Sequence, residues 1–210
     1  MEIITAVRSP GWEDGTRPTG PVALLLHGYG SHERDLPGLA PWLPSGMPWV
    51  SPRAPLAMGV GHAWFPLSLP DPPSADHVDR ATTALWEWLD VTLGAEAQVV
   101  PVGFSQGGLM ATQLLRTRPE RVAATVVLAG FVAGTAQPAD ALLAERRPPV
   151  FWGRGDEDPV IPQEAVSRAA EFLPHHSVLT ERVYPGLGHS VDQRVMDDVR
   201  DFLEAAVDAR

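Results

Sequence analysis

The segment Gln98-Val99-Val100-Pro101-Val102-Gly103-Phe104-Ser105-Gln106-Gly107-Gly108-Leu109 joins an apolar run to a glycine-rich turn. The run 98–102 predicts a buried strand, and residues 109–116, which end shortly before Pro119, predict a helix. The turn between them reads G-x-S-x-G, and at a strand-to-helix corner this pattern places its serine at a sharp turn that only small neighbours permit. The same pattern also occurs in glycine-rich turns without chemistry. Ser105 is therefore a candidate nucleophile whose partners must be found elsewhere in the chain.

The rest of the chain repeats the alternation of strand and helix. Further short apolar runs, each followed by a glycine or a turn, predict strands at 22–26, 123–128, 149–152 and 179–184. Apolar residues spaced three and four apart predict helices within 78–89 and 195–206. This alternation predicts an α/β fold with a mostly parallel central sheet and helices on both faces. No repeat or linker divides the chain, so we expect one domain over residues 1–210.

Composition and charge narrow the class of protein. Apolar residues make up 44% of the 210 residues and charged residues 20%, as is usual for a folded globular protein. The formal net charge of −10 repels phosphate backbones and anionic surfaces, so a nucleic-acid partner is not expected. The chain has no cysteine, which excludes disulfides and thiol nucleophiles. Residues 1–8 lack a basic, apolar leader and no run reaches membrane-span length, so we expect a cytoplasmic protein without an integral membrane segment.

A serine nucleophile needs a base, and the base needs a carboxylate to orient it. The acidic loop 153–162 follows the predicted strand 149–152 and offers Asp158 and Asp156. Either aspartate could instead cap a turn through its own backbone, as aspartates before proline often do. We take Asp158 as the candidate acid, with Asp156 as the alternative.

Position along the last predicted strand separates the three downstream histidines. His175 and His176 precede the strand 179–184, whereas His189 follows it. Because chemistry gathers at the carboxyl ends of parallel strands, His189 should share an edge with Ser105 and Asp158. The adjacent pair should lie on the surface, and no H-E-x-x-H spacing suggests a metal.

Acyl transfer also requires backbone donors for the oxyanion that forms in the transition state. The residue after the nucleophile and the loop after an early strand usually supply them, which indicates the N–H groups of Gln106 and Tyr29. The glycines on both sides of Tyr29 would let this loop turn its N–H inward. We expect His27, at the start of the loop, to form structural hydrogen bonds.

The segment from Pro37 to Pro73 is rich in proline and tryptophan. The prolines exclude a long helix, and the segment is too apolar for a solvated linker. We expect a rigid layer of loops that lines a pocket. In the alternative, this is a stiff surface excursion whose tryptophans only fill the core.

These motifs resemble the phospholipase/carboxylesterase family of α/β-hydrolases, which includes small carboxylesterases and acyl-protein thioesterases. The resemblance extends from about residue 22 to the C-terminal helix and is carried mainly by 103–108, 155–162 and 184–189, with 27–30 and Asp35 similar to the oxyanion loop. It implies the α/β-hydrolase fold, a catalytic triad of Ser105, Asp158 and His189, and oxyanion donors Tyr29 and Gln106. It favours Asp158 over Asp156, because the acid of the family motif directly precedes the proline. It also implies that Trp64 and Phe65 form a substrate-binding pair beside the pocket.

The expected activity is a serine carboxylesterase that acts on small to medium acyl esters through an acyl-enzyme on Ser105, without a metal or organic cofactor. An uncharged acyl chain would be favoured by the apolar side chains of Trp64, Phe65, Leu67 and Leu69. The short interval 128–158 leaves room for only one short helix, so we expect an open site without a cap domain. Alternatives are a thioesterase or lysophospholipase with longer acyl chains, transfer of the acyl group to another nucleophile, and a silent binding domain. Exposed tryptophans around an open site would favour a homodimer.

Overall fold

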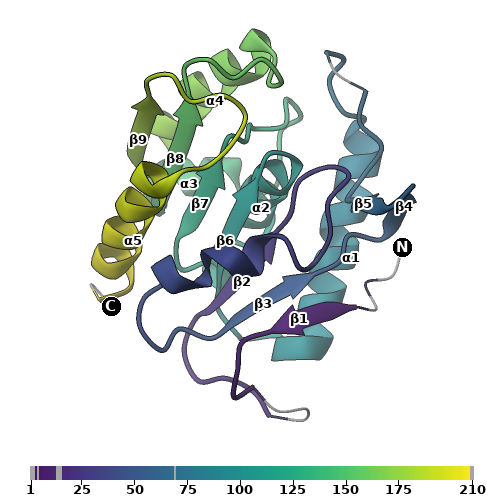
Figure 1. Cartoon of the computed structure of the whole chain (residues 1–210), viewed down its shortest axis with the longest axis vertical. Helices are drawn as coiled ribbons and strands as arrows, with labels where there is room; N and C mark the ends of the chain where they lie inside the picture. The colour runs from purple at the N-terminus through teal and green to yellow at the C-terminus, as the bar shows by residue number, and fades with distance from the viewer. Residues whose placement is uncertain (1–2, 4, 13–15, 69, 209–210) are drawn as a thin grey trace.

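The fold is a twisted sheet with helices on both faces (Figure 1). The computed structural model describes residues 3, 5–12, 16–68 and 70–208. The strands of the main sheet are β1 (Ala6–Arg8), β2 (Val22–Leu26), β3 (Trp49–Pro52), β6 (Val99–Phe104), β7 (Thr125–Leu128), β8 (Pro149–Gly155) and β9 (Val178–Tyr184). Their order is β1-β3-β2-β6-β7-β8-β9, and every pair is parallel except β1 with β3. The prediction of a mostly parallel α/β sheet is confirmed.

Two further groups of elements surround this sheet. The helices are α1 (Ala75–Leu93), α2 (Gln106–Thr117), α3 (Asp140–Arg146), α4 (Gln163–His176) and α5 (Gln193–Asp208), with 3₁₀ helices at Leu36–Trp42 and Pro119–Arg121. A small antiparallel hairpin consists of β4 (Leu56–Met58) and β5 (Gly61–Ala63). Of the helices that the structure describes, none is both long and apolar enough to cross a membrane.

Strand β2 shows why the central strands are apolar at every position. Val22, Leu24 and Leu26 pack into one core with α1, α2 and α4, whereas Ala23 and Leu25 pack into a second core with α5. All five side chains of β2 are almost completely buried. Successive side chains of a strand point to opposite faces, so a sheet covered by helices on both faces buries all of them.

The segment 37–73 is only in part the expected layer of loops: residues 66–68 line a cavity as loop, but other parts form strands. It contributes β3 to the main sheet, between β1 and β2, and it also forms the hairpin β4–β5. The prolines explain why β3 has only four residues, since proline cannot donate a ladder hydrogen bond and Pro52 is the last residue of the strand. Trp64, which follows β5, is fully buried in the core, as in the alternative interpretation of this segment.

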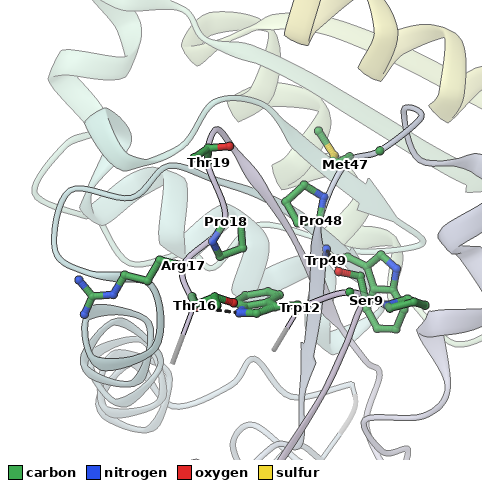
Figure 2. Close-up of a pocket in the computed structure, with 12 residues that line it drawn as sticks. Ser9, Trp12, Thr16, Arg17, Pro18, Thr19, Met47, Pro48 and Trp49 are labelled. Carbon is green, nitrogen blue, oxygen red and sulfur yellow. Dashed lines mark hydrogen bonds between the residues drawn. The ribbon is translucent and has the colours of Figure 1, made fainter. Parts of the chain in front are cut away.

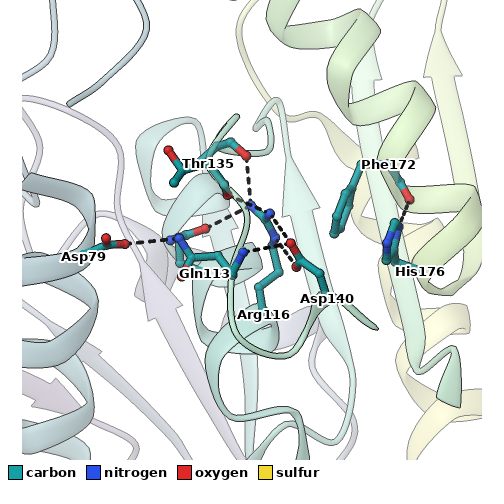
Figure 3. Close-up of polar contacts among 9 residues, drawn as sticks. Asp79, Gln113, Arg116, Thr135, Asp140, Phe172 and His176 are labelled. Carbon is teal, nitrogen blue, oxygen red and sulfur yellow. Dashed lines mark hydrogen bonds and ion pairs between the residues drawn. The ribbon is translucent and has the colours of Figure 1, made fainter. Parts of the chain in front are cut away.

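Arg116 of α2 fixes the connection between β7 and β8 (Figure 3). Its guanidinium donates two hydrogen bonds to Asp140 of α3, both of 2.8 Å, and others to the backbone oxygens of Ala133 and Thr135. The ring of Phe172 on α4 lies 4.5 Å from it. The connection thus holds one short helix bound tightly to α2, and no cap domain is inserted within these fully described residues.

Candidate active site

Ser105 lies at the corner between β6 and α2, in a backbone conformation that residues other than glycine rarely adopt. Its φ is 54° and its ψ is −114°. The corner requires glycine on both sides: a Cβ on Gly103 would lie 2.0 Å from the Gly107 oxygen, and one on Gly107 would lie 1.9 Å from the Leu26 oxygen. The Ser105 N–H donates to the Leu128 oxygen of β7 over 2.8 Å, which fixes the turn to the sheet. Strain of this kind is typical of residues held in place for chemistry.

The structure brings the side chains of Ser105, His189 and Asp158 into one hydrogen-bonded chain. His189 Nε2 lies 2.9 Å from Ser105 Oγ, and His189 Nδ1 lies 2.7 Å from Asp158 Oδ2. With Nδ1–H donating to the carboxylate, Nε2 is free to accept the serine proton. The three residues follow the carboxyl ends of β6, β9 and β8, and the Phe104 ring packs 4.9 Å from the His189 ring.

The two candidate acids have different partners. Asp158 uses Oδ2 for His189, and its Oδ1 accepts the N–H groups of Val160 at 2.8 Å and Ile161 at 3.2 Å. Asp158 therefore caps a turn and contacts the histidine at the same time. Asp156 Oδ1 instead accepts the Gly186 N–H at 2.7 Å, which holds the loop that leads to His189.

The two expected oxyanion donors lie at the start of α2 and in the loop after β2. Gln106 is the first residue of α2, where N–H groups have no partner within the helix and the helix dipole favours negative charge. Within the described ranges, neither the Gln106 N–H nor the Tyr29 N–H donates a hydrogen bond. On either side of Tyr29, Gly28 O accepts from Ser31 N–H, and Gly30 N–H donates to His62 O.

His27 forms the structural hydrogen bonds expected from the sequence. Its Nδ1–H donates to the Gly28 oxygen over 2.8 Å, and its Nε2 accepts the Ala54 N–H over 3.1 Å. Burial lowers the pKa of the His27 imidazole, in keeping with a neutral ring that donates once and accepts once.

His175 and His176 lie at the end of α4, before β9, where each contacts a backbone oxygen of its own helix. His175 is exposed, as predicted, whereas His176 is half-buried and its ring stacks on that of Phe172.

The expectation that Trp64 and Phe65 contact substrate disagrees with their burial. Both side chains are completely inaccessible and pack in the core. The physical reason is that the segment after β5 turns into the molecule, where the Gln106 side chain accepts the Trp64 N–H at 3.0 Å and donates to the Phe65 oxygen at 2.7 Å. Sequence reasoning missed these contacts because the partners are 41 and 42 residues apart.

All seven tryptophans lie among the described residues: Trp64, Trp86 and Trp152 are buried and the other four are partly exposed, whereas the fully exposed tryptophans expected at a dimer contact are missing. Clusters that could bind a metal are likewise missing from the part of the chain that the structure describes. The oligomeric state and the independence from cofactors stay predictions.

One cavity adjoins an expected oxyanion donor, and a larger one lies away from Ser105. A cavity of about 260 Å³ is bounded by Tyr29, by Met58 of the hairpin and by Leu67. Leu69, which was also expected near the acyl chain, lies outside the described residues. A larger cavity of about 630 Å³ is lined by Trp12, Arg17 and Trp49 among others (Figure 2). Trp49 is the first residue of β3, so this cavity lies at the amino ends of the parallel strands, whereas Ser105 lies at their carboxyl ends.

Comparison with known proteins places the chain in a family. The family model described as Phospholipase/Carboxylesterase matches residues 12–207. The chain belongs to this phospholipase/carboxylesterase family. The α/β-hydrolase fold and the family resemblance predicted from the sequence are thereby confirmed.

Individual members of the phospholipase/carboxylesterase family show how far the similarity extends. Acyl-protein thioesterase 1 of Cryptococcus neoformans is 24% identical over 219 residues, which cover 89% of this chain and 92% of the relative. Acyl-protein thioesterase 1 of Kluyveromyces lactis is 31% identical over 110 residues, so the match spans about half of each protein, 50% of this chain and 48% of the relative. The crystal structure of the Bacillus cereus carboxylesterase has a TM-score of 0.81 and 21% identity, covering 96% of this chain and 93% of that one, which supports the fold.

Proposed function

We propose that this chain is a serine carboxylesterase that hydrolyses small to medium acyl esters through an acyl-enzyme on Ser105. The observation that carries the proposal is the continuous chain of contacts from Ser105 Oγ through the His189 ring to Asp158. A serine hydroxyl is a weak nucleophile near neutral pH, and a neutral imidazole within hydrogen-bond distance is the base that it needs.

The first half of the reaction forms the acyl-enzyme. His189 Nε2 takes the Ser105 proton as Oγ attacks the ester carbonyl, and Asp158 stabilises the imidazolium that forms. The tetrahedral intermediate then collapses, the bond to the leaving alcohol breaks, and His189 gives its proton to that alcohol. The Tyr29 and Gln106 N–H groups stabilise the oxyanion, at a helix N-terminus that already favours negative charge.

The second half of the reaction restores the enzyme. Water attacks the acyl-enzyme while His189 takes a proton from it, and collapse of the second tetrahedral intermediate returns a proton to Ser105 and releases the carboxylic acid. Every proton moves between Ser105, His189, water and substrate. The chemistry proposed here requires no metal and no organic cofactor.

Because Tyr29 is one of the two proposed oxyanion donors, we place the acyl group in the cavity beside Tyr29. Its volume of about 260 Å³ lies below the roughly 300–1,000 Å³ of sites for drug-sized ligands, and Met58 and Leu67 make part of its wall apolar. Asp71 and His77 also line the cavity, so an acyl chain there would contact polar as well as apolar side chains. The names of the relatives support a second candidate, thioester hydrolysis, which proceeds through the same acyl-enzyme with a thiol as leaving group.

A fluorophosphonate probe tests for an activated serine. We expect one adduct per chain by intact mass for the wild type, none for Ser105→Ala, and strongly slowed labelling for His189→Ala. His175→Ala is the matched control, because His175 is exposed and its Nδ1 contacts a backbone oxygen of α4, and it should label like the wild type. A folded wild-type protein that does not label would favour a silent binding domain and overturn the proposal.

Turnover of p-nitrophenyl esters and acyl thioesters of increasing chain length then tests the substrate class. We expect the highest kcat/KM for short and medium esters. A maximum at long-chain thioesters would favour the thioesterase alternative, and product analysis with an added alcohol would separate hydrolysis from acyl transfer.

Combining Ser105→Ala with His189→Ala should lower kcat little further than either change alone, because the pair acts as a unit.

A further inference from the structure

Trp64 connects the two segments that carry the proposed oxyanion donors. Its backbone N–H donates to Gln106 Oε1 over 3.0 Å, and its indole Nε1–H donates to the His27 oxygen over 2.9 Å. Gln106 is itself one donor residue, and His27 lies two positions before the other, Tyr29. We propose that Trp64 is a positioning residue that sets the distance between the Tyr29 and Gln106 N–H groups. This inference rests on the proposed function.

The connection to the Gln106 side uses the whole side-chain amide of Gln106. Oε1 accepts the Trp64 N–H, and Nε2 donates to the Phe65 oxygen over 2.7 Å. Gln106 is fully buried, so water does not compete for these bonds. The first turn of α2 is thereby fixed to the chain directly after β5.

The connection to the Tyr29 side is made twice, once by the indole and once by the backbone of β5. Gly30 N–H donates to His62 O over 2.8 Å, and His62 N–H donates to Ser31 O over 2.7 Å. The approach is so close that a Cβ on Gly61 would lie 1.8 Å from the Gly30 oxygen. Residues 61–65 therefore form a clamp, which contacts the loop after β2 at one end and Gln106 at the other.

A rigid clamp matters because the donors of an oxyanion hole act only at the correct separation. Donors are effective about 2.7–3.1 Å from the developing oxyanion, and removing one costs about 10²–10³ in kcat. Without the indole N–H, the buried His27 oxygen loses a partner and the loop that presents Tyr29 loses one of its anchors. Because Trp64 is inaccessible, its loss should impair stabilisation of the transition state and leave substrate binding intact.

Trp64→Phe removes the indole N–H and keeps an aromatic ring. We expect kcat for p-nitrophenyl acetate to fall about 10- to 100-fold, as the partial loss of one donor predicts, with KM changed less than about twofold. The Ki of phenylboronic acid, whose serine adduct is tetrahedral, should rise by a similar factor, because the adduct uses the same N–H groups. A merely structural role would lower thermal stability without shifting Ki in parallel with kcat.

Trp86→Phe is the matched control. Trp86 is 2% exposed and its indole N–H donates to Thr117 Oγ1 over 2.9 Å, at the far end of α2 from Ser105. It should lower the melting temperature but leave kcat, KM and the boronate Ki within about twofold of the wild type. Equal loss of kcat in both variants would overturn the inference, as would wild-type kcat in folded Trp64→Phe, or a change in KM alone, which would indicate substrate contact.

Gln106→Met keeps the backbone N–H donor of residue 106 but removes both side-chain hydrogen bonds to the clamp. If Trp64→Phe does not fold, Gln106→Met tests the same inference. The same fall in kcat with constant KM is expected, and wild-type kcat would overturn the inference. The outcome is distinct from failure of the proposed function, which would show as a wild-type protein without fluorophosphonate labelling or esterase activity.

Discussion

Asp158 holds His189 with one carboxylate oxygen while the other oxygen caps a turn. Oδ2 is 2.7 Å from His189 Nδ1, and Oδ1 accepts the N–H groups of Val160 and Ile161. The two interpretations that the sequence leaves open for this residue, turn cap and triad acid, are therefore both geometrically satisfied. The cap holds the carboxylate in one orientation, so that it meets the histidine without first ordering a free side chain.

Asp158→Asn should separate these two contacts. The asparagine oxygen can still accept both backbone N–H groups, which leaves its NH₂ facing His189 Nδ1 and forces the proton onto Nε2, the wrong tautomer for a base. We expect kcat to fall by roughly 10³–10⁴ while the free energy of unfolding changes by less than roughly 0.5 kcal/mol. Ester turnover and urea unfolding measure the two effects.

Two controls sharpen that comparison. Asp158→Ala should lose the same activity and also roughly 1 kcal/mol of stability, because the turn cap is gone. Asp156→Asn keeps an acceptor for the Gly186 N–H and should retain kcat within about tenfold. A larger loss in Asp156→Asn than in Asp158→Asn would reverse the assignment of the acid.

The backbone of Ser105 predicts a trade of stability against activity. At φ 54° and ψ −114°, a residue with a Cβ is strained by roughly 1–3 kcal/mol, whereas glycine adopts the region freely. Ser105→Gly should therefore be more stable than Ser105→Ala by roughly 1 kcal/mol after the extra entropy of unfolded glycine is subtracted. Both variants should be inactive, and chemical denaturation compares them; a less stable glycine variant would contradict stored strain at this corner.

The close approach at Gly103 predicts a much larger effect from one methyl group. A Cβ there would meet the Gly107 oxygen at 2.0 Å and the Gly107 carbon at 2.3 Å, both backbone atoms that cannot rotate away. Gly103→Ala should cost at least roughly 3 kcal/mol in unfolding free energy. Gly38→Ala, at a position with open space around it and no positive φ, should change stability by less than roughly 1 kcal/mol. Thermal unfolding of the pair tests the packing of the elbow.

The features that could be predicted from the sequence are those encoded by residues close to one another along the chain. The elbow around Ser105 has a strand, small residues and a helix next to one another, and β6 indeed ends at Phe104, directly before the serine. The topology rule that chemistry lies at the carboxyl ends of parallel strands distinguished His189 from His175 and His176 without any contact information. These inferences need only the order of elements along the chain.

The parts that were not predicted depend on contacts between distant segments. Strand β1 has three residues and is stabilised by β3, which lies within a proline-rich stretch that reads as loop. The buried state of Trp64 follows from the Gln106 side chain, and nothing in the local pattern of 64–65 distinguishes a pocket wall from a core residue. One signal was available for the hairpin β4–β5: Gly59-Val60 between Met58 and Gly61 is a two-residue loop with glycine first.

An ion pair beside the loop after β2 predicts a pH dependence of stability. Glu33, whose side chain is 3% exposed, accepts two hydrogen bonds of 2.6 Å from Arg53, and these bonds lower the pKa of the Glu33 carboxyl to about 2. Because the folded pKa lies below the unfolded value of 4.5, the pair stabilises the fold above pH 4.5, and this stabilisation is lost as the pH falls toward 2. Glu33→Gln should therefore be less stable than the wild type by roughly 1–2 kcal/mol at pH 7, less than the pKa shift alone implies because the partly exposed Arg53 is screened by water, and the difference should shrink below pH 4.5. Urea unfolding between pH 7 and pH 3 measures this difference in unfolding free energy. Asp76→Asn is the control, because Asp76 pairs with Arg80 on the exposed face of α1. This substitution should change the unfolding free energy by less than roughly 0.5 kcal/mol over the same pH range. A Glu33→Gln difference that stays constant over this range would show that the ionised pair contributes packing but no electrostatic stabilisation.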